Sequence, residues 1–312
     1  MLSGAAAIIA GLALSRTGHA AEEPADRGIL VARGRTLAVV HPAGDERQLA
    51  TLEVGAFASD VAWSPDGSRI AFSQYTARRG EGPGGADILV LPASGAAEPL
   101  FAARRERPGT LLGSPVWLPD GSGLLFETVG GTPLAGPIAR VEQVGVDGSG
   151  RRMILADARQ PALSRDGSRL AFVRPLPDGD ALMVGSPGGG DARMLVPPDK
   201  LLALAYPRFA PDGSQIAFVG VGSLEGARVS PEQREAWVAA HGLPWSLFVV
   251  DATGGDARMV GQLAEDDAAV AWSPDGSSIA FSGAAGLKLV LVTDGSITQV
   301  NASTAYGGID WR

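Results

Sequence analysis

The stretch Val61-Ala62-Trp63-Ser64-Pro65-Asp66-Gly67-Ser68-Arg69-Ile70-Ala71-Phe72 predicts a β-hairpin. An apolar run ending in an aromatic residue leads into Ser-Pro-Asp-Gly. Pro65 presets φ for the first turn position, and Gly67 accepts the left-handed conformation at the last. Ile70-Ala71-Phe72 then leaves the turn as the second strand. This unit decides the fold because near copies of it return along the whole chain.

Four further copies carry the same turn chemistry followed by a phenylalanine. They are Val116-Trp117-Leu118-Pro119-Asp120-Gly121 to Phe126, Ala162-Leu163-Ser164-Arg165-Asp166-Gly167 to Phe172, Arg208-Phe209-Ala210-Pro211-Asp212-Gly213 to Phe218, and Ala271-Trp272-Ser273-Pro274-Asp275-Gly276 to Phe281. Ile309-Asp310-Trp311 looks like the start of a sixth copy. A repeat that continues to the C-terminus favours one continuous domain over two ordinary ones.

A second pattern of apolar runs with glycine-bearing turns lies between these hairpins, so each repeat has four short strands. The aromatic (or Leu) position recurs at spacings of 39 to 63 residues, which is typical of a β-propeller blade. Strands from Ile29 to Ala50 have no Trp-bearing strand before them, while Gly308 to Arg312 has no strands after it. We therefore predict an all-β, six-bladed propeller over residues 29–312, closed by pairing the C-terminal strand with the N-terminal strands.

The Trp-Ser-Pro-Asp-Gly-x-x-Ile-Ala-Phe repeats resemble those of TolB-type β-propellers, a WD40-like group of bacterial exported proteins and peptidase propeller domains. The resemblance covers about residues 29 to 312. It implies the propeller fold strongly and the function weakly, because one fold hosts many functions. TolB itself carries a separate N-terminal α/β domain, for which we see no counterpart in this sequence.

Composition fits an all-β protein and excludes several classes. The 312 residues include 43 Gly and 22 Pro, with a hydrophobic fraction of 45%. The net charge of −8 argues against a nucleic-acid binder, which needs a basic face. The absence of cysteine excludes disulfides and thiolate metal sites. We expect a monomer.

The N-terminus predicts export. Residues 1–21 hold an apolar run, Ala5 to Leu14, followed by Gly18-His19-Ala20-Ala21, whose small residues fit a signal-peptidase site. No Lys or Arg precedes the run, so an uncleaved membrane anchor is the alternative. Residues 22–28 are polar and are expected to form a linker. A periplasmic or extracellular location follows from either interpretation.

Little in the sequence points to catalysis. No Gly-x-Ser-x-Gly motif occurs, and the histidines are His19, His41 and His241. The glycine-rich residues 80–85 imitate a dinucleotide motif, but they contain Pro83 and open no helix. The repeated Asp before Gly is expected to cap its own turn rather than share a metal. We predict no catalytic residues, cofactor or metal site.

Candidate binding residues lie where the innermost strands approach the channel mouth. Three residues before the aromatic position, the repeats place Asp60, Ser114, Gln160, Tyr206, Ala269 and Gly308; Asp266, Asp267 and Tyr306 lie slightly upstream. Arg208 and Asp310 immediately precede the aromatic, where they could pair across the channel or bond separately to solvent and a neighbouring blade. This polar, net acidic set suits a peptide, a cation or a small polar ligand.

One insertion, at about residues 220–244, gives the longest spacing. Ser230-Pro231-Glu232-Gln233 predicts a helix start by its capping-box pattern, and Gly242 and Pro244 predict the end. Packing against the propeller through Trp237 is one interpretation. A partner-binding feature that includes Arg234, Trp237 and His241 is the other.

These observations favour an exported, non-catalytic scaffold that binds a protein or peptide partner. The alternative is an enzyme, such as a lyase or hydrolase, or a small-ligand sensor, with its site at the channel mouth.

Overall fold

The computed structural model describes residues 28–77, 84–95, 98–132, 136–222, 224, 245–265, 268–303 and 307–312. These residues form 24 strands and no helix. Correspondingly, no helix within these ranges has the length and apolar character needed to cross a membrane. The predicted helix of the 220–244 insertion lies outside the described residues.

The strands pair in groups of four, each group an antiparallel meander. Blade 1 comprises β24 (Ile309–Trp311), β1 (Ile29–Arg33), β2 (Thr36–Val40) and β3 (Glu46–Thr51); blade 2 comprises β4 (Ala56–Trp63), β5 (Arg69–Thr76), β6 (Gly85–Pro92) and β7 (Leu100–Ala103). Blade 3 comprises β8 (Leu111–Trp117), β9 (Gly123–Thr132), β10 (Gly136–Gly145) and β11 (Arg152–Ala156). Blade 4 comprises β12 (Arg159–Leu163), β13 (Leu170–Leu176), β14 (Gly179–Gly185) and β15 (Arg193–Val196). Blade 5 comprises β16 (Ala203–Phe209), β17 (Gln215–Val221), β18 (Ser246–Asp251) and β19 (Arg258–Gln262), and blade 6 comprises β20 (Ala269–Trp272), β21 (Ser278–Gly283), β22 (Gly286–Leu291) and β23 (Ile297–Asn301).

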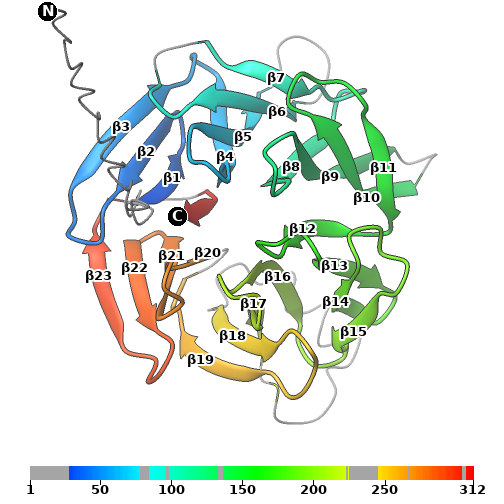
Figure 1. Cartoon of the computed structure of the whole chain (residues 1–312), viewed down its shortest axis with the longest axis vertical. Helices are drawn as coiled ribbons and strands as arrows, with labels where there is room; N and C mark the ends of the chain where they lie inside the picture. The colour runs from blue at the N-terminus through cyan, green and yellow to red at the C-terminus, as the bar shows by residue number, and fades with distance from the viewer. Residues whose placement is uncertain are drawn as a thin grey trace, which may run out of the picture.

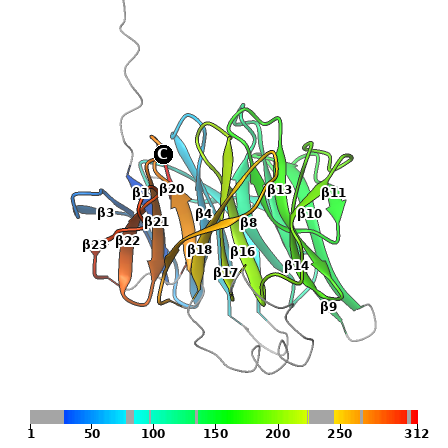
Figure 2. The ribbon, with the colours of Figure 1, turned by 90° about the horizontal axis from the view of Figure 1, so that it is seen from below.

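Blades 2 and 3 are hydrogen-bonded into one eight-stranded sheet, whereas the other sheets have four strands each. The link is a single parallel pair between β6 and β8, at Ala86 and Leu111. Dividing the sheet at that contact gives six blades. Figure 1 shows them around a central axis, with β4, β8, β12, β16, β20 and the C-terminal strand innermost; Figure 2 shows the disc from the side.

The two ends of the described chain meet in blade 1, as the sequence predicts. β24 pairs antiparallel with β1, with Trp311 opposite Ile29 and Ile309 opposite Val31. Ala32 also donates its N–H to the carbonyl of Gly308. The C-terminal strand thereby covers the inner edge of β1, which would otherwise present unpaired backbone groups.

The repeated turn is held by its own side chains. Asp66 accepts from the Ser68 N–H at 3.0 Å and from the Ser64 hydroxyl at 2.6 Å, while Gly67 adopts φ +64°. Hydrogen bonds from Ser64 and then Ser68 hold the pKa of Asp66 well below its usual range. Asp120, Asp166, Asp212 and Asp275 accept equivalent bonds from the serine two residues on. The aspartates therefore act as turn caps.

The core consists of six apolar clusters, each between two neighbouring blades. The phenylalanine that ends each repeat is fully buried in its cluster; these are Phe72, Phe126, Phe172, Phe218 and Phe281. Two turn arginines add links between blades. Arg69 donates to the Gly121 carbonyl at 2.9 Å, and Arg169 donates to the Gly213 carbonyl at 2.6 Å. The blades thus form rigid walls around the channel.

Candidate functional site

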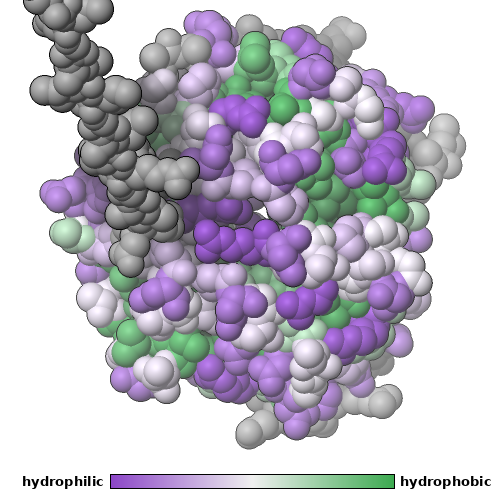
Figure 3. Space-filling model, in the orientation of Figure 1, coloured by the Kyte–Doolittle hydropathy of each residue, from purple (hydrophilic) through white to green (hydrophobic). Residues whose placement is uncertain are grey.

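The innermost strands end around a cavity of about 240 Å³ on the face that carries the repeated turns. We call it the turn-end cavity. All six blades contribute, through positions within 61–65, 115–117, 162–165, 208–211, 271–274 and 310–312. Figure 3 shows this face, with hydrophilic surface around the central opening. Because each blade presents the same part of its repeat, the cavity is a direct product of the hairpin that organises the sequence.

The lining is apolar with a basic rim. Its apolar part includes the turn prolines Pro65, Pro211 and Pro274 and the aromatic residues of the repeat. Its charged groups are Arg165, Arg208, Arg312 and Asp310. Among the side chains of the described lining residues, three guanidinium groups against one carboxylate give a basic lining in a chain whose net charge is −8. Such a site favours an apolar group carried next to a negative charge.

Asp310 and Arg208 serve different neighbours. The Asp310 carboxylate accepts the backbone N–H of Trp63 at 2.7 Å, which ties blade 1 to blade 2, and its contact to Arg312 is 4.0 Å. Arg208 donates to the Pro207 carbonyl, and its own carbonyl accepts the Trp272 indole N–H at 3.0 Å. Within the described part of the chain, therefore, Asp310 makes the inter-blade bond rather than a pair with Arg208. All four charged side chains line the cavity, and the carboxylate of Asp310 is already hydrogen-bonded to blade 2.

Deeper along the channel, the candidates three residues before the aromatic form a chain of hydrogen bonds between blades. Ser114 donates its N–H to Asp60 at 3.0 Å, and Tyr206 donates its N–H to the Gln160 side-chain oxygen at 3.0 Å. Glu127 joins the two pairs: it accepts the Ser114 hydroxyl at 3.0 Å and the Gln160 N–H at 2.9 Å. We call these five residues the polar belt. It links blades 2, 3, 4 and 5.

The belt forms where the strands are irregular. The pairing of β8, β12 and β16 shifts at Ser114, Gln160 and Tyr206, and these residues have φ of 48°, 48° and 53°. Left-handed conformations are unfavourable for residues other than glycine. At each bulge the freed N–H turns toward the preceding blade, where a belt side chain accepts it. The inter-blade hydrogen bonds therefore stabilise the strained positions.

Glu127 is the belt residue that the sequence analysis missed. Burial raises the pKa of its carboxyl, and the nearby Asp60 carboxylate adds to the rise, against the hydrogen bonds from Gln160 and Ser114. It lies on β9 rather than on an innermost strand. A signal was present: Glu127 directly follows the repeat phenylalanine, where the other copies carry Ser73, Val173, Val219 and Ser282.

No protein-family model matches the chain, and no curated protein matches its sequence. Solved structures do match its fold. A chain in the crystal structure of a nidogen/laminin complex has a TM-score of 0.67 at 14% identity, covering 91% of this chain and 97% of that one. TolB from Acinetobacter baumannii has a TM-score of 0.62 at 16% identity, covering 91% of this chain and 66% of that one. The fold is that of a TolB-like β-propeller.

A putative TolB from Agrobacterium tumefaciens gives the same result, with a TM-score of 0.55 at 17% identity over 74% of this chain and 75% of that one. Identities this low concern the fold alone. The site of this TolB-like propeller must therefore be argued from its own residues.

Some candidate residues lie outside the described parts of the TolB-like propeller. They are Asp266, Asp267 and Tyr306 near the channel, and Arg234, Trp237 and His241 in the insertion. Among the described residues, no group of three Asp, Glu, His or Cys side chains is arranged to hold a metal ion. The described candidates separate into two levels: Arg208 and Asp310 line the turn-end cavity, and Asp60, Ser114, Gln160 and Tyr206 belong to the polar belt.

Proposed function

We propose that this TolB-like propeller is an exported, non-catalytic scaffold that binds a protein or peptide partner in the turn-end cavity. One observation carries the proposal: an apolar cavity of about 240 Å³, with Arg165, Arg208 and Arg312 as its basic groups. Among the described lining residues, the one side-chain carboxylate, that of Asp310, already accepts backbone hydrogen bonds. A peptide that inserts an apolar side chain and places a carboxylate against the arginines would match it.

The rigidity of the cavity supports binding without a large rearrangement. The Trp117 indole N–H donates to the Ala62 carbonyl at 3.1 Å, and that of Trp272 donates to the Arg208 carbonyl at 3.0 Å, each bond joining two blades. Side chains held in this way have little freedom left to lose when a partner docks. The export part of the proposal rests on residues 1–21, whose apolar run and small-residue site are typical of a signal peptide or anchor.

The polar belt favours a second candidate, a small-ligand sensor or an enzyme. Asp60 and Glu127 both accept from Ser114, and the raised pKa of Glu127 is a property that general acids share. Both carboxylates are, however, occupied by hydrogen bonds between blades. Binding or turnover that Glu127→Gln abolishes and Arg208→Ala leaves intact would support this candidate over the partner-binding one.

The experiment places a photo-crosslinking residue at Leu163, in the turn-end cavity, and a matched one at Leu291, exposed on β22. Each variant is expressed in its native envelope, and the captured peptide segment is identified by mass spectrometry. The segment is then synthesised and its Kd is measured against wild type, Arg208→Ala and Arg165→Ala. Arg258→Ala is the control, because Arg258 is exposed on β19 outside the cavity.

We expect capture from Leu163 only, and a loss of affinity of about tenfold for Arg208→Ala with none for Arg258→Ala. Equal capture at Leu291, or equal affinity across the arginine variants, would contradict the proposal. A variant lacking residues 224–243 tests the insertion containing Arg234, Trp237 and His241 as the rival binding element. If this deletion abolished capture while the arginine variants kept their affinity, the binding site would be assigned to the insertion.

A further inference from the structure

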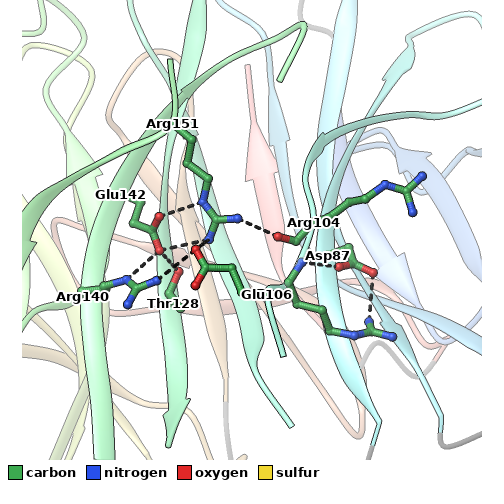
Figure 4. A network of polar contacts seen from close by, with 8 residues as sticks. Asp87, Arg104, Glu106, Thr128, Arg140, Glu142 and Arg151 are labelled. Atoms are coloured by element: carbon green, nitrogen blue, oxygen red, sulfur yellow. Dashed lines mark hydrogen bonds and ion pairs between the residues drawn. The ribbon is translucent and has the colours of Figure 1, made fainter. Parts of the chain in front are cut away.

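A second, smaller cavity lies away from the channel, at the junction of blades 2 and 3. Its volume is about 90 Å³, and it is lined by Glu106, Arg107, Thr110, Thr128, Arg140 and Arg151. A single water needs roughly 15 Å³ on the same measure, so the space holds a group of several heavy atoms. Figure 4 shows the polar network of this region. Arginine guanidinium groups bind phosphate oxygens through two parallel hydrogen bonds, and a threonine hydroxyl can donate one more.

The two central arginines are fixed by a buried carboxylate. Glu142, on β10, accepts from Arg140 Nε at 2.8 Å, from Arg151 Nε at 2.7 Å and from Thr128 Oγ1 at 2.5 Å. Burial acts to raise the pKa of Glu142, but the bonds from Arg151, Thr128 and Arg140 outweigh it and lower the pKa to about 2. Glu142 is thus ionised at any physiological pH. It positions the guanidinium planes and neutralises one of their charges.

The loop after β7, which carries Glu106 and Arg107, is hydrogen-bonded through Arg104 and Arg105 to blade 3 and to blade 2. Arg105 donates to Asp87 through its backbone N–H at 2.7 Å and its side chain at 2.9 Å. Arg151 donates to the Arg104 carbonyl at 2.6 Å. Figure 4 shows the bond between Arg151 and Arg104. The cavity is therefore preorganised, which reduces the entropic cost of binding a ligand.

Glu106 meets the arginines only loosely. Its carboxylate lies 3.7 Å from Arg140 Nη2 and 3.8 Å from Arg151 Nη2, beyond hydrogen-bond distance, and its side chain is 61% exposed. Around the cavity, Arg107, Arg140 and Arg151 oppose Glu106 and Glu142, so three positive and two negative charges leave one net positive charge. An anion able to hydrogen-bond the guanidinium groups directly would compete well with Glu106.

We propose that this cavity binds a small tetrahedral oxyanion, phosphate or a phosphate monoester, on Arg107, Arg140 and Arg151 with the Thr110 hydroxyl, and that Glu106 occupies the ligand's place when it is absent. The site lies outside the channel and does not depend on partner binding at the turn-end cavity. Removing the charge of Glu106 should raise the affinity for the anion, and removing the charge of an arginine should lower it. The direction of each change therefore tests the proposal.

The test titrates the purified full chain with inorganic phosphate at constant ionic strength, followed by calorimetry, and repeats the titration with glycerol phosphate. We expect saturable millimolar binding by wild type. Glu106→Gln should tighten it about threefold to tenfold, because a competing charge near two arginines is removed. Arg140→Gln should weaken it about tenfold. Arg107→Gln, at an exposed position that the fold does not need, should weaken it about threefold.

The matched controls are Glu98→Gln and Arg258→Gln, both at exposed positions outside this cavity, which should leave the affinity unchanged. Binding of glycerol phosphate as well as phosphate would assign the site to monoesters, and binding of phosphate alone would assign it to the free anion. Absence of saturable binding, or equal affinity in wild type, Glu106→Gln and Arg107→Gln, would overturn the proposal.

Discussion

Ser73, Glu127 and Ser282 occupy one repeat position, directly after the buried phenylalanine, and each reaches a neighbouring innermost strand or the segment leading into it. The Ser73 hydroxyl donates to the Leu112 carbonyl at 2.6 Å, and the Ser282 hydroxyl donates to the Gly307 carbonyl at 3.0 Å. Glu127 accepts from two residues instead. This position thus links blades 2 and 3, 3 and 4, and 6 and 1 near the channel, and of the three side chains only Glu127 carries a charge.

We predict that Glu127 makes stability depend on pH. Its pKa is raised in the folded protein, so its stabilising contribution is complete below the unfolded value of about 4.3 and is lost as pH rises through the folded value. The free energy of unfolding of wild type, relative to that of Glu127→Gln, should therefore be highest near pH 4 and should fall toward pH 7. Urea denaturation across this range measures the difference.

Glu53→Gln is the matched control, because Glu53 is an exposed glutamate outside the polar belt. A stability difference between wild type and Glu127→Gln that does not change with pH would contradict the role given to burial and to Asp60.

The turn aspartates and Glu127 show what sequence could predict at this scale. An Asp before Gly in such a turn accepts hydrogen bonds from backbone groups of the same turn. Asp66 could therefore be assigned as a cap from the turn sequence alone. The role of Glu127 depends on Ser114 and on Gln160 of the next blade, which no local pattern reveals. Its charge at an otherwise apolar or serine position was the available signal.

The short strand β24 contacts three blades. Ile309 and Trp311 are buried in the cluster between blades 6 and 1, and Asp310 bonds the Trp63 N–H of blade 2. These three residues therefore contribute to one core cluster, complete one sheet and link three blades.

We predict that deleting residues 307–312 opens the ring. The loss should cost at least about 4 kcal/mol, since removing a buried tryptophan alone costs about 3–5 kcal/mol, and the exposed edge of β1 should promote association. Thermal unfolding and light scattering measure both effects. Deleting residues 1–27 is the matched control, because the described strands begin after it, and it should leave the Tm within a few degrees. An unchanged Tm without residues 307–312 would refute closure by β24.

The strands were predictable where the repeat specifies them and unpredictable where the blades meet. Turn chemistry and alternation predicted the hairpins and the joining of Gly308–Arg312 to the first strands. They could not predict the bulges at Ser114, Gln160 and Tyr206, because these left-handed residues are stabilised by N–H groups that donate to side chains of another blade.

At the scale of the whole molecule, near-identical blades produce a ring whose function depends on how the copies differ. The repeat places a turn, a proline and an aromatic around the cavity, while Arg165, Arg208 and Arg312 are differences between blades. The same holds for the polar belt and for the oxyanion cavity at the junction of blades 2 and 3. The repeats in the sequence predicted the scaffold. Predicting the sites would have required knowing which of the residues that differ between blades lie close together in the fold.

Hydrogen–deuterium exchange measures partner binding at the turn-end cavity. The protein is compared with and without the peptide segment captured from Leu163. We predict new protection at the backbone around 61–65, 115–117, 162–165 and 208–211, with the outer strands β3, β15 and β19 unchanged. Protection confined to the outer strands or to residues 224–243, with none around the cavity, would contradict it.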